Sequence, residues 1–226
     1  MTIHILQNFK NNTFFSRTNK KILKNHEYNG IPVMLQKMAA LITILLMSPL
    51  LLLVFFLIKI ESSGSALFSQ TRVGENGRHF KMYKFRSMYI SSDPKYKEPD
   101  PTKSSREGVC KKYINDTRIT NVGQFIRKYS IDEIPQLFNI LRGDMCLVGP
   151  RPALSIEAYE YDRFIQPRLF TKPGLTGLWQ ISGRADTNFE QQLQLDKTYI
   201  KQQSFLMDCK IIALTIPAVL SGKGAY

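Results

Sequence analysis

The stretch AALITILLMSPLLLLVFFLI, from Ala39 to Ile58, decides the fold of this chain. It contains no charged residue, and 14 of its 20 residues are Leu, Ile, Val or Phe. At about 1.5 Å per residue, a helix of this length reaches roughly 30 Å, which is the thickness of the hydrocarbon core of a bilayer. The stretch therefore predicts a helix that enters a membrane. We do not expect a cleaved signal peptide, because a long polar segment precedes the stretch.

Ser48 and Pro49 stand at the middle of this apolar stretch. Proline removes a backbone donor and pushes against the preceding turn, so each flanking half is long enough for only half a bilayer. The cations near the two ends are almost equal in number, whereas the positive-inside rule normally depletes one side. Both features favour a re-entrant hairpin with its two ends in the cytoplasm. The alternative is a kinked helix that spans the membrane, since proline is tolerated in such helices.

Composition narrows the class of partner. The chain has 226 residues and a formal net charge of +13, which favours a polyanionic partner: nucleic acid, anionic lipid or a phosphorylated substrate. Its 43% hydrophobic content excludes a disordered or collagen-like polypeptide. The three cysteines and three histidines have no metal-ligand spacing, so a zinc site and a disulfide framework are both poor interpretations.

Two cations alternate along the segment FKMYKFRSM, residues 80–88, which has the composition of a strand. A strand would place Lys84 and Arg86 on one face about 6.6 Å apart. That spacing suits two oxygens of a diphosphate. The alternative is an ordinary solvated face.

Two adjacent carboxylates open a predicted helix. Ser130 and Glu133 match a capping box in front of an apolar pattern with helical spacing. Asp132 then falls in the first turn, where the positive helix end favours its ionised form. Such a carboxylate can serve as a nucleophile or as a magnesium ligand, although acidic residues are also common in first turns for structural reasons alone. Pro135 can shift the start of this helix.

Two stiff loops carry further arginines. The sequence GPRP, residues 149–152, holds Arg151 between two prolines, which suits a guanidinium that grips phosphate. A second loop rich in glycine ends at Arg184. Asp196 falls in the apolar stripe of the next predicted helix, so it needs a partner such as Arg184 or a metal ion. A structural ion pair and a role in the site both remain open for Asp196.

Long motifs of this chain match one family. Through them the chain resembles the monotopic phosphoglycosyl transferases, also called bacterial sugar transferases, over roughly residues 37–226. The motifs are the Ser48-Pro49 pair, KFRSM (84–88), SIDEIPQLFN (130–139), LRGDM (141–145), LVGPRP (147–152) and KPGLTG (172–177).

The resemblance implies a reaction. Enzymes of this family take a sugar 1-phosphate from a UDP-sugar, pass it to polyprenyl phosphate and release UMP. By resemblance, Asp132 would attack the phosphate and hold a phospho-sugar intermediate, while Glu133 would assist, and both would hold Mg²⁺. The family pattern also implies that further residues line or brace the site, namely Lys84, Arg127, Arg151, Arg184 and Asp196, to which the strand spacing adds Arg86.

The resemblance also implies an architecture. We expect an α+β protein with a re-entrant membrane helix broken at Ser48-Pro49, a mainly helical catalytic domain with a small β element, and interfacial amphipathic helices. The expected units are a basic extension (1–36), the re-entrant helix (37–60) and the catalytic domain (61–226). The expected location is the cytoplasmic face of the bacterial inner membrane.

Other classes of function compete with this one. A membrane scaffold without enzymatic activity would use the same basic charge to hold anionic lipid or a partner protein. A nucleic-acid binder fits less well, because no basic stripe with interleaved aromatic residues is evident. The expected partners are a UDP-sugar, polyprenyl phosphate and membrane lipids, and no nucleic acid is expected. The oligomeric state, a homodimer or a monomer, stays open. The motifs do not identify the sugar.

Overall fold

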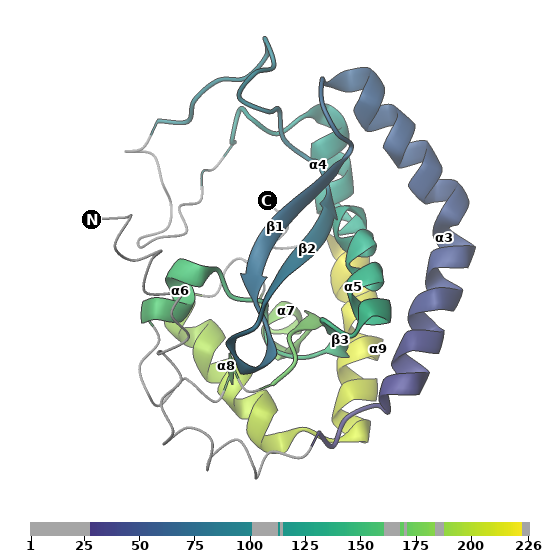
Figure 1. Cartoon of the computed structure of the whole chain (residues 1–226), viewed down its shortest axis with the longest axis vertical. Helices are drawn as coiled ribbons and strands as arrows, with labels where there is room; N and C mark the ends of the chain where they lie inside the picture. Colours follow the sequence, from purple (N-terminus) through teal and green to yellow (C-terminus); the bar gives the residue numbers. More distant parts are fainter. Residues whose placement is uncertain are drawn as a thin grey trace.

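The protein combines helices and short strands, with helix predominating (Figure 1). The structure is a computed structural model that describes residues 28–100, 113, 115–160, 168–169, 171–183 and 188–222. Its first element is the long helix α3 (Val33–Glu61). The others are β1 (Leu67–Val73), η1 (Glu75–Gly77), β2 (His79–Phe85), α4 (Asn121–Lys128), η3 (Ile131–Gln136), α5 (Leu137–Arg142), β3 (Cys146–Val148), α6 (Ser155–Glu160), β4 (Gly174–Thr176), α7 (Leu178–Ile181), α8 (Phe189–Gln202) and α9 (Phe205–Ser221).

Helix α3 runs through Pro49 without a break, whereas the sequence predicted two separated halves. Pro49 has no N–H to donate to the carbonyl of Leu45, four residues earlier. The Ser48 hydroxyl donates to that carbonyl oxygen instead, at 2.8 Å. The orphaned acceptor is therefore satisfied and the helix continues. Figure 1 shows α3 as an arc along one side of the molecule, with both ends turned toward the rest of the chain.

Strands β1 and β2 form an antiparallel hairpin. Leu67 pairs with Phe85 and Val73 pairs with His79. The turn between the strands includes Asn76 at φ 56°, in the left-handed region that asparagine tolerates better than most residues. Strand β2 confirms the strand predicted around residue 80, but it ends at Phe85, one residue before Arg86.

A second, parallel pair consists of β3 and β4. Here the backbones of Gly149 and Gly174 approach closely, and a Cβ atom at Gly174 would lie 2.1 Å from the nitrogen of Gly149. Only glycine fits this contact. The contact fixes the start of the loop that carries Arg151.

Both halves of α3 pack on the same body. Ala40, from the first half, is buried with Phe80 and Ile140, and the partly buried Ile44 packs against them. Val54, from the second half, belongs to a different buried cluster. That second cluster contains Val54, Ile58, Ala66, Phe85, Ile126 and Ile131.

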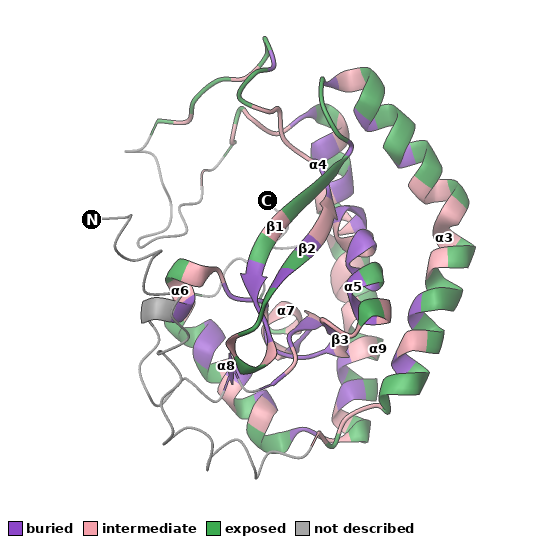
Figure 2. Cartoon of the chain, in the orientation of Figure 1, coloured by how far each residue is buried: buried purple, intermediate pink, exposed green. Residues whose placement is uncertain are grey.

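The outer face of α3 is apolar and exposed (Figure 2). Among the described residues, α3 is the one helix that is long and apolar enough to cross a membrane. Only Gln36, Ala40, Val54 and Ile58 of its 29 residues are buried. The core helix of a soluble protein would bury far more of such a sequence. The exposed side chains of α3 therefore suit an apolar environment outside the folded body.

Helix α9, near the end of the described residues, includes the apolar stretch 211–220. Ile211 and Asp208 face inward, whereas Leu206, Ile216 and Leu220 are exposed. Helix α9 is thus a packed helix with an outer apolar surface of its own.

Candidate active site

Asp132 and Glu133 lie on η3, a short 3-10 helix. The predicted capping box is absent, because Ser130 adopts a left-handed conformation, with φ 52° and ψ 23°, and its side chain caps no amide. Pro135 lies inside this segment, and α-helical structure begins only at Leu137. The α-helix therefore starts later than the sequence predicted, at Leu137, and Asp132 lies in the 3-10 helix before it.

The two carboxylates differ in burial. Asp132 is buried, with 8% of its surface exposed. The Glu133 carboxylate is partly exposed and forms an ion pair with the Lys84 ammonium of β2, with 2.5 Å between Oε1 and Nζ. The dyad therefore consists of a buried acid, Asp132, and a partly exposed acid, Glu133. Lys84 links Glu133 to the β1–β2 hairpin.

Arg127 supplies a second cation from the last turn of α4. Its charge favours the ionised form of Asp132, as does that of Lys84. The Nη1 atom of Arg127 is buried and has no hydrogen-bond partner within the described part of the chain. A buried guanidinium with unused donors beside a carboxylate is suited to an incoming phosphate.

Burial raises the pKa of Asp132 to about 6, and the neighbouring Glu133 carboxylate acts in the same direction. Lys84 and Arg127 oppose this rise but do not cancel it. The sequence predicted that a helix end would favour ionisation, but burial outweighs that effect here. At neutral pH Asp132 is mostly ionised, yet it is poorly solvated, which is a suitable state for a nucleophile.

Asp132 and Glu133 are the side chains of the candidate site that could bind a magnesium ion. No group of three or more His, Cys, Asp or Glu side chains that could hold a metal occurs in the described residues. Magnesium commonly needs only one or two carboxylates from the protein and takes its other ligands from water and substrate phosphates. Asp132 and Glu133 are adjacent carboxylates of this kind, so the residues present fit the ion.

The structure does not place Arg86 beside Lys84. Because β2 ends at Phe85, the Arg86 side chain leaves the strand face and is buried at the end of α3. Its guanidinium donates to the backbone oxygens of Ser62 and Ser63 and to the Ser62 hydroxyl. The Nη1 and Nη2 donors of Arg86 are therefore occupied by the turn after α3, and its binding of a diphosphate stays a prediction.

Arg151 and Asp196 belong to a separate buried group. Asp196 on α8 pairs with Arg168, with 2.9 Å between Oδ2 and Nε. Arg168 in turn donates to the carbonyl oxygen of Arg151 at 2.7 Å. The Arg151 guanidinium lies over the ring of Trp179, 5.4 Å from its centre.

This arrangement identifies the partner of Asp196. Burial raises the pKa of Asp196 to about 6, against the opposing charges of Arg168 and Arg151. The pair braces the loop of Arg151, which is the structural alternative foreseen for Asp196. Arg168 was not predicted, because it lies outside the motifs. Arg184, the partner suggested by the sequence, lies outside the described residues.

Asn139 is a further residue that the sequence analysis missed. Its fully buried amide donates to the carbonyl oxygen of Lys81 at 2.7 Å and accepts from the backbone nitrogen of Tyr83 at 3.1 Å. These bonds fasten α5 to β2 next to Lys84. An asparagine between Phe138 and Ile140 was the available signal, since a polar residue in an apolar helical segment needs a partner.

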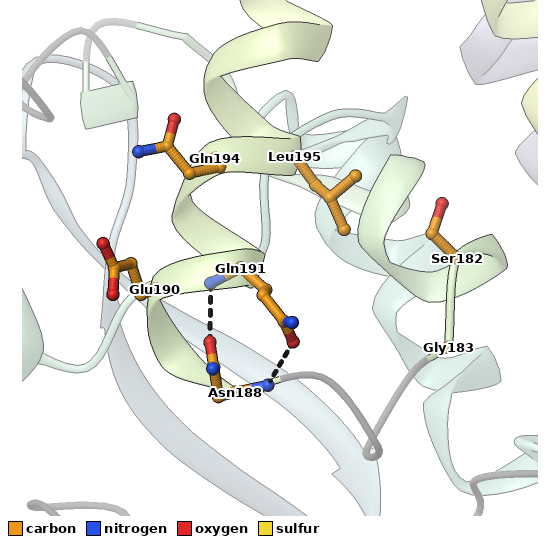
Figure 3. A pocket seen from close by; sticks show the side chains of 7 residues that line it. All are labelled: Ser182, Gly183, Asn188, Glu190, Gln191, Gln194 and Leu195. Atoms are coloured by element: carbon orange, nitrogen blue, oxygen red, sulfur yellow. Dashed lines mark hydrogen bonds between the residues drawn. The ribbon is translucent and has the colours of Figure 1, made fainter.

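An open pocket of about 760 Å³ lies at the start of α8 (Figure 3). Asn188 and Gln191 form the capping box of α8 there, and Glu190 supplies a carboxylate. The described residues that line the pocket include no cation and neither member of the Asp132-Glu133 dyad. Phosphoryl transfer needs cations to stabilise charge, and the dyad has Lys84 and Arg127 near it, so we place the candidate site at the dyad.

Comparisons with known proteins show the family of this chain. The family described as bacterial sugar transferase matches residues 29–222. The exopolysaccharide production protein ExoY of Rhizobium meliloti (strain 1021) is 42% identical over 194 residues, which cover 84% of this chain and 85% of that protein.

Two further relatives have names that state a reaction. The undecaprenyl-phosphate galactose phosphotransferase of Salmonella typhimurium is 41% identical over 83% of this chain and 40% of that protein. The UDP-glucose:undecaprenyl-phosphate glucose-1-phosphate transferase of Caulobacter vibrioides is 42% identical over 83% of this chain and 68% of that protein. The chain therefore belongs to the bacterial sugar transferase family and is a phosphoglycosyl transferase.

Proposed function

We propose that this enzyme transfers a sugar 1-phosphate from a UDP-sugar to polyprenyl phosphate and releases UMP. The observation that carries the proposal is the buried Asp132 carboxylate beside Glu133, with Lys84 and Arg127 as neighbouring cations. The names of relatives support these substrates and point to glucose or galactose as the sugar. The reaction would be the first membrane step in the synthesis of an exopolysaccharide, a capsule or an O-antigen.

In the first half-reaction, a carboxylate oxygen of Asp132 attacks the phosphorus that bears the sugar. A phosphorus–oxygen bond forms to Asp132, and the bond between the two phosphates breaks, so UMP leaves with the bridging oxygen. Lys84 and Arg127 neutralise charge on the phosphoryl oxygens. The enzyme then holds an aspartyl phospho-sugar.

In the second half-reaction, an oxygen of the lipid phosphate attacks the same phosphorus. The bond to Asp132 breaks, the carboxylate is regenerated, and the sugar leaves on a lipid diphosphate. Glu133 would take a proton from any lipid phosphate that arrives in its monoprotonated form.

Asp132 and Glu133 are the residues that would hold Mg²⁺. When bound, the ion would supply positive charge to the diphosphate and the departing UMP. Glu133 is the more accessible of the two carboxylates, and Lys84 already brings a positive charge to it. Glu133 is therefore the carboxylate that would be available to the ion, and Lys84 would be available to the substrate phosphates.

Helix α3 would dip into one leaflet and return. Ala40 and Val54 lie in opposite halves of α3, yet both pack against the folded body. A straight spanning helix of this length, about 43 Å, would separate its ends by more than a bilayer core. The arc with an exposed apolar face supports re-entry, with the dyad at the cytoplasmic surface. The exposed residues of α9 would rest at the interface, where anionic headgroups attract the basic chain.

The test is UMP release by the purified full chain in lipid nanodiscs. The mixture contains Mg²⁺, polyprenyl phosphate and either UDP-glucose or UDP-galactose. Wild type should release UMP with one of them, and Asp132→Asn should release less than 1% as much. Glu98→Gln, an exposed carboxylate elsewhere in the chain, is the matched control and should keep full activity.

Two results would contradict the proposal. Wild-type protein that binds lipid but releases no UMP from these or other UDP-sugars would favour the membrane scaffold. Turnover without a sugar-phosphate adduct on Asp132, sought by mass spectrometry after incubation without lipid acceptor, would remove the covalent route.

A further inference from the structure

The last residue of α3 caps a helix far along the chain. The Glu61 carboxylate accepts from the backbone nitrogens of Asn121 and Val122, at 2.7 and 2.9 Å. The Thr120 hydroxyl accepts from the nitrogen of Gly123 at 2.8 Å. The first three amides of α4 are thus satisfied by side chains, and a residue 60 positions earlier supplies two of the acceptors. A negative charge at this helix end is also electrostatically favourable.

Arg86 ties the same end of α3 to β2. Its guanidinium holds the carbonyl oxygens of Ser62 and Ser63, which immediately follow the helix. Because these donors come from the residue just after β2, the strand and the helix end are fixed to each other. We call Glu61 and Arg86 together the α3 clasp.

The two elements held by the α3 clasp carry the cations of the candidate site. Lys84 lies two residues before Arg86, and Arg127 lies in the last turn of α4. Beneath them, Ile58 of α3 shares a buried cluster with Ile126 and Ile131. Ile126 precedes Arg127, and Ile131 precedes Asp132. The end of α3 therefore packs against the residues that precede Arg127 and Asp132 in the chain.

We propose that Glu61 and Arg86 are positioning residues for phosphoryl transfer, which hold Arg127 and Lys84 in register with Asp132 from the end of the membrane helix. This inference rests on the function proposed above. Neither residue of the α3 clasp needs to touch the substrate. Loss of the α3 clasp lets α4 and β2 shift relative to η3, and a misplacement of about 1 Å near reacting groups can cost about 100-fold in rate.

The test uses the first half-reaction alone. Full-length protein in nanodiscs is mixed with UDP-sugar and Mg²⁺ without lipid acceptor, and the burst of UMP is timed by rapid quenching. Glu61→Ala should slow the burst about 10- to 100-fold. Amide hydrogen exchange at Asn121 and Val122 should rise in the same variant, which reports the loss of the cap directly.

Thr120→Ala is the matched control. It removes a hydrogen bond from the same helix end but leaves the link to α3 intact. It should lower the thermal midpoint about as much as Glu61→Ala, while its burst rate stays within threefold of wild type. Glu61→Gln keeps one acceptor oxygen and should give an intermediate burst rate.

Arg86→Lys separates positioning from phosphate binding. Lysine keeps the charge but cannot reproduce the forked contact with two carbonyl oxygens. The α3 clasp predicts a burst at least tenfold slower with the apparent KM for UDP-sugar within twofold of wild type. A rise in KM with an unchanged burst rate would assign Arg86 to the substrate and overturn its positioning role.

The wild-type burst tests the proposed function, and the comparison of Glu61→Ala with Thr120→Ala tests the clasp inference, so the two can fail separately. If wild type gives no burst, the proposed function fails. If wild type gives a burst and Glu61→Ala slows it no more than Thr120→Ala does, the clasp inference fails alone. Should Glu61→Ala not fold, the same comparison is made with Glu61→Gln, for which a burst rate equal to that of Thr120→Ala is the contrary result.

Discussion

Burial disfavours the ionised form of Asp132. The proposed function explains why this cost would be retained, because a nucleophilic carboxylate must reach phosphate while it is shielded from water. A pKa raised from 3.8 to about 6 corresponds to about 3 kcal/mol against the charged form. Lys84 and Arg127 offset only part of the cost of burial. The same imbalance predicts two measurable consequences.

The first consequence concerns stability. Asp132→Asn should raise the free energy of unfolding at pH 7.5 by about 1 to 3 kcal/mol, because it removes a buried charge. The folded protein holds the Asp132 proton more tightly than the unfolded chain does, so wild type should lose stability as pH rises from about 4 to 6. Denaturant unfolding at several pH values should show a shallower loss in Asp132→Asn. Glu98→Gln should match wild type, and an Asp132→Asn protein less stable than wild type at pH 7.5 would contradict this assignment.

The second consequence concerns activity. A nucleophilic Asp132 must be ionised, so the rate of UMP release should fall as pH drops through about 6, approaching tenfold per pH unit below it. The groups that set this value are Glu133, Lys84 and Arg127, and the dyad titrates as a unit. Initial rates between pH 5 and 8 provide the measurement. A profile that stays flat down to pH 5 would exclude Asp132 as the group that must be ionised.

At the scale of elements, α3 reaches both buried clusters because it follows an arc (Figure 1). Proline favours curvature because it lacks a donor and its ring crowds the preceding turn, and the Ser48 hydroxyl donates to the Leu45 carbonyl oxygen that Pro49 leaves without a partner. An arc can place Ala40 and Val54 on one body. In a straight helix, either Ala40 or Val54 would lose its contact with the folded body.

Pro49→Ala should therefore restore the backbone hydrogen bond to Leu45 and straighten α3. We expect a loss of about 1 to 2 kcal/mol in stability, because buried apolar contact is lost at one end, and a fall in UMP release of about threefold or more. Thermal unfolding and activity in nanodiscs provide the measurements. Ser48→Ala keeps Pro49 and is the control: it should cost about 1 kcal/mol through the lost hydrogen bond without straightening α3. Equal stability and activity in Pro49→Ala and wild type would show that the bend is not needed.

Helix α5 owes its position on β2 to Asn139. Asn139→Ala leaves the carbonyl of Lys81 and the N–H of Tyr83 without their partner and opens a small cavity. We expect destabilisation by about 2 to 4 kcal/mol together with reduced UMP release, because Lys84 follows on the same strand. Urea unfolding measures the first effect, and Asn121→Ala, an exposed asparagine on α4, is the control. A cost below about 0.5 kcal/mol would mean that these bonds contribute little.

At the scale of the whole molecule, the proposed topology places both ends of α3 on one side of the membrane. Asn29→Cys and Ser91→Cys put thiols on exposed positions before and after the helix. A membrane-impermeant maleimide should label both from the cytoplasmic side and neither from the other side, in a background where Cys110 and Cys209 are replaced by serine. Labelling of the two positions from opposite sides would establish a spanning helix instead.

Several features of this protein follow from the sequence alone. The apolar composition of residues 39–58 requires an apolar environment wherever the helix lies, and the alternation in residues 80–85 favours a strand. The motif around Asp132 and Glu133 places two carboxylates side by side because they are adjacent in the chain. These conclusions are available because each depends on local periodicity or on neighbouring residues.

Only the tertiary structure decided which cations face Asp132 and which partners the other charged residues have. Arg86 and Lys84 look equivalent on an ideal strand, but the strand ends between them and Arg86 is buried at the end of α3. Arg168, distant in sequence, reaches Asp196, and burial reverses the expected direction of the pKa of Asp132. The physical reason is that desolvation and ion pairing depend on everything packed around a group, and most of that surrounding structure comes from residues far away in the chain.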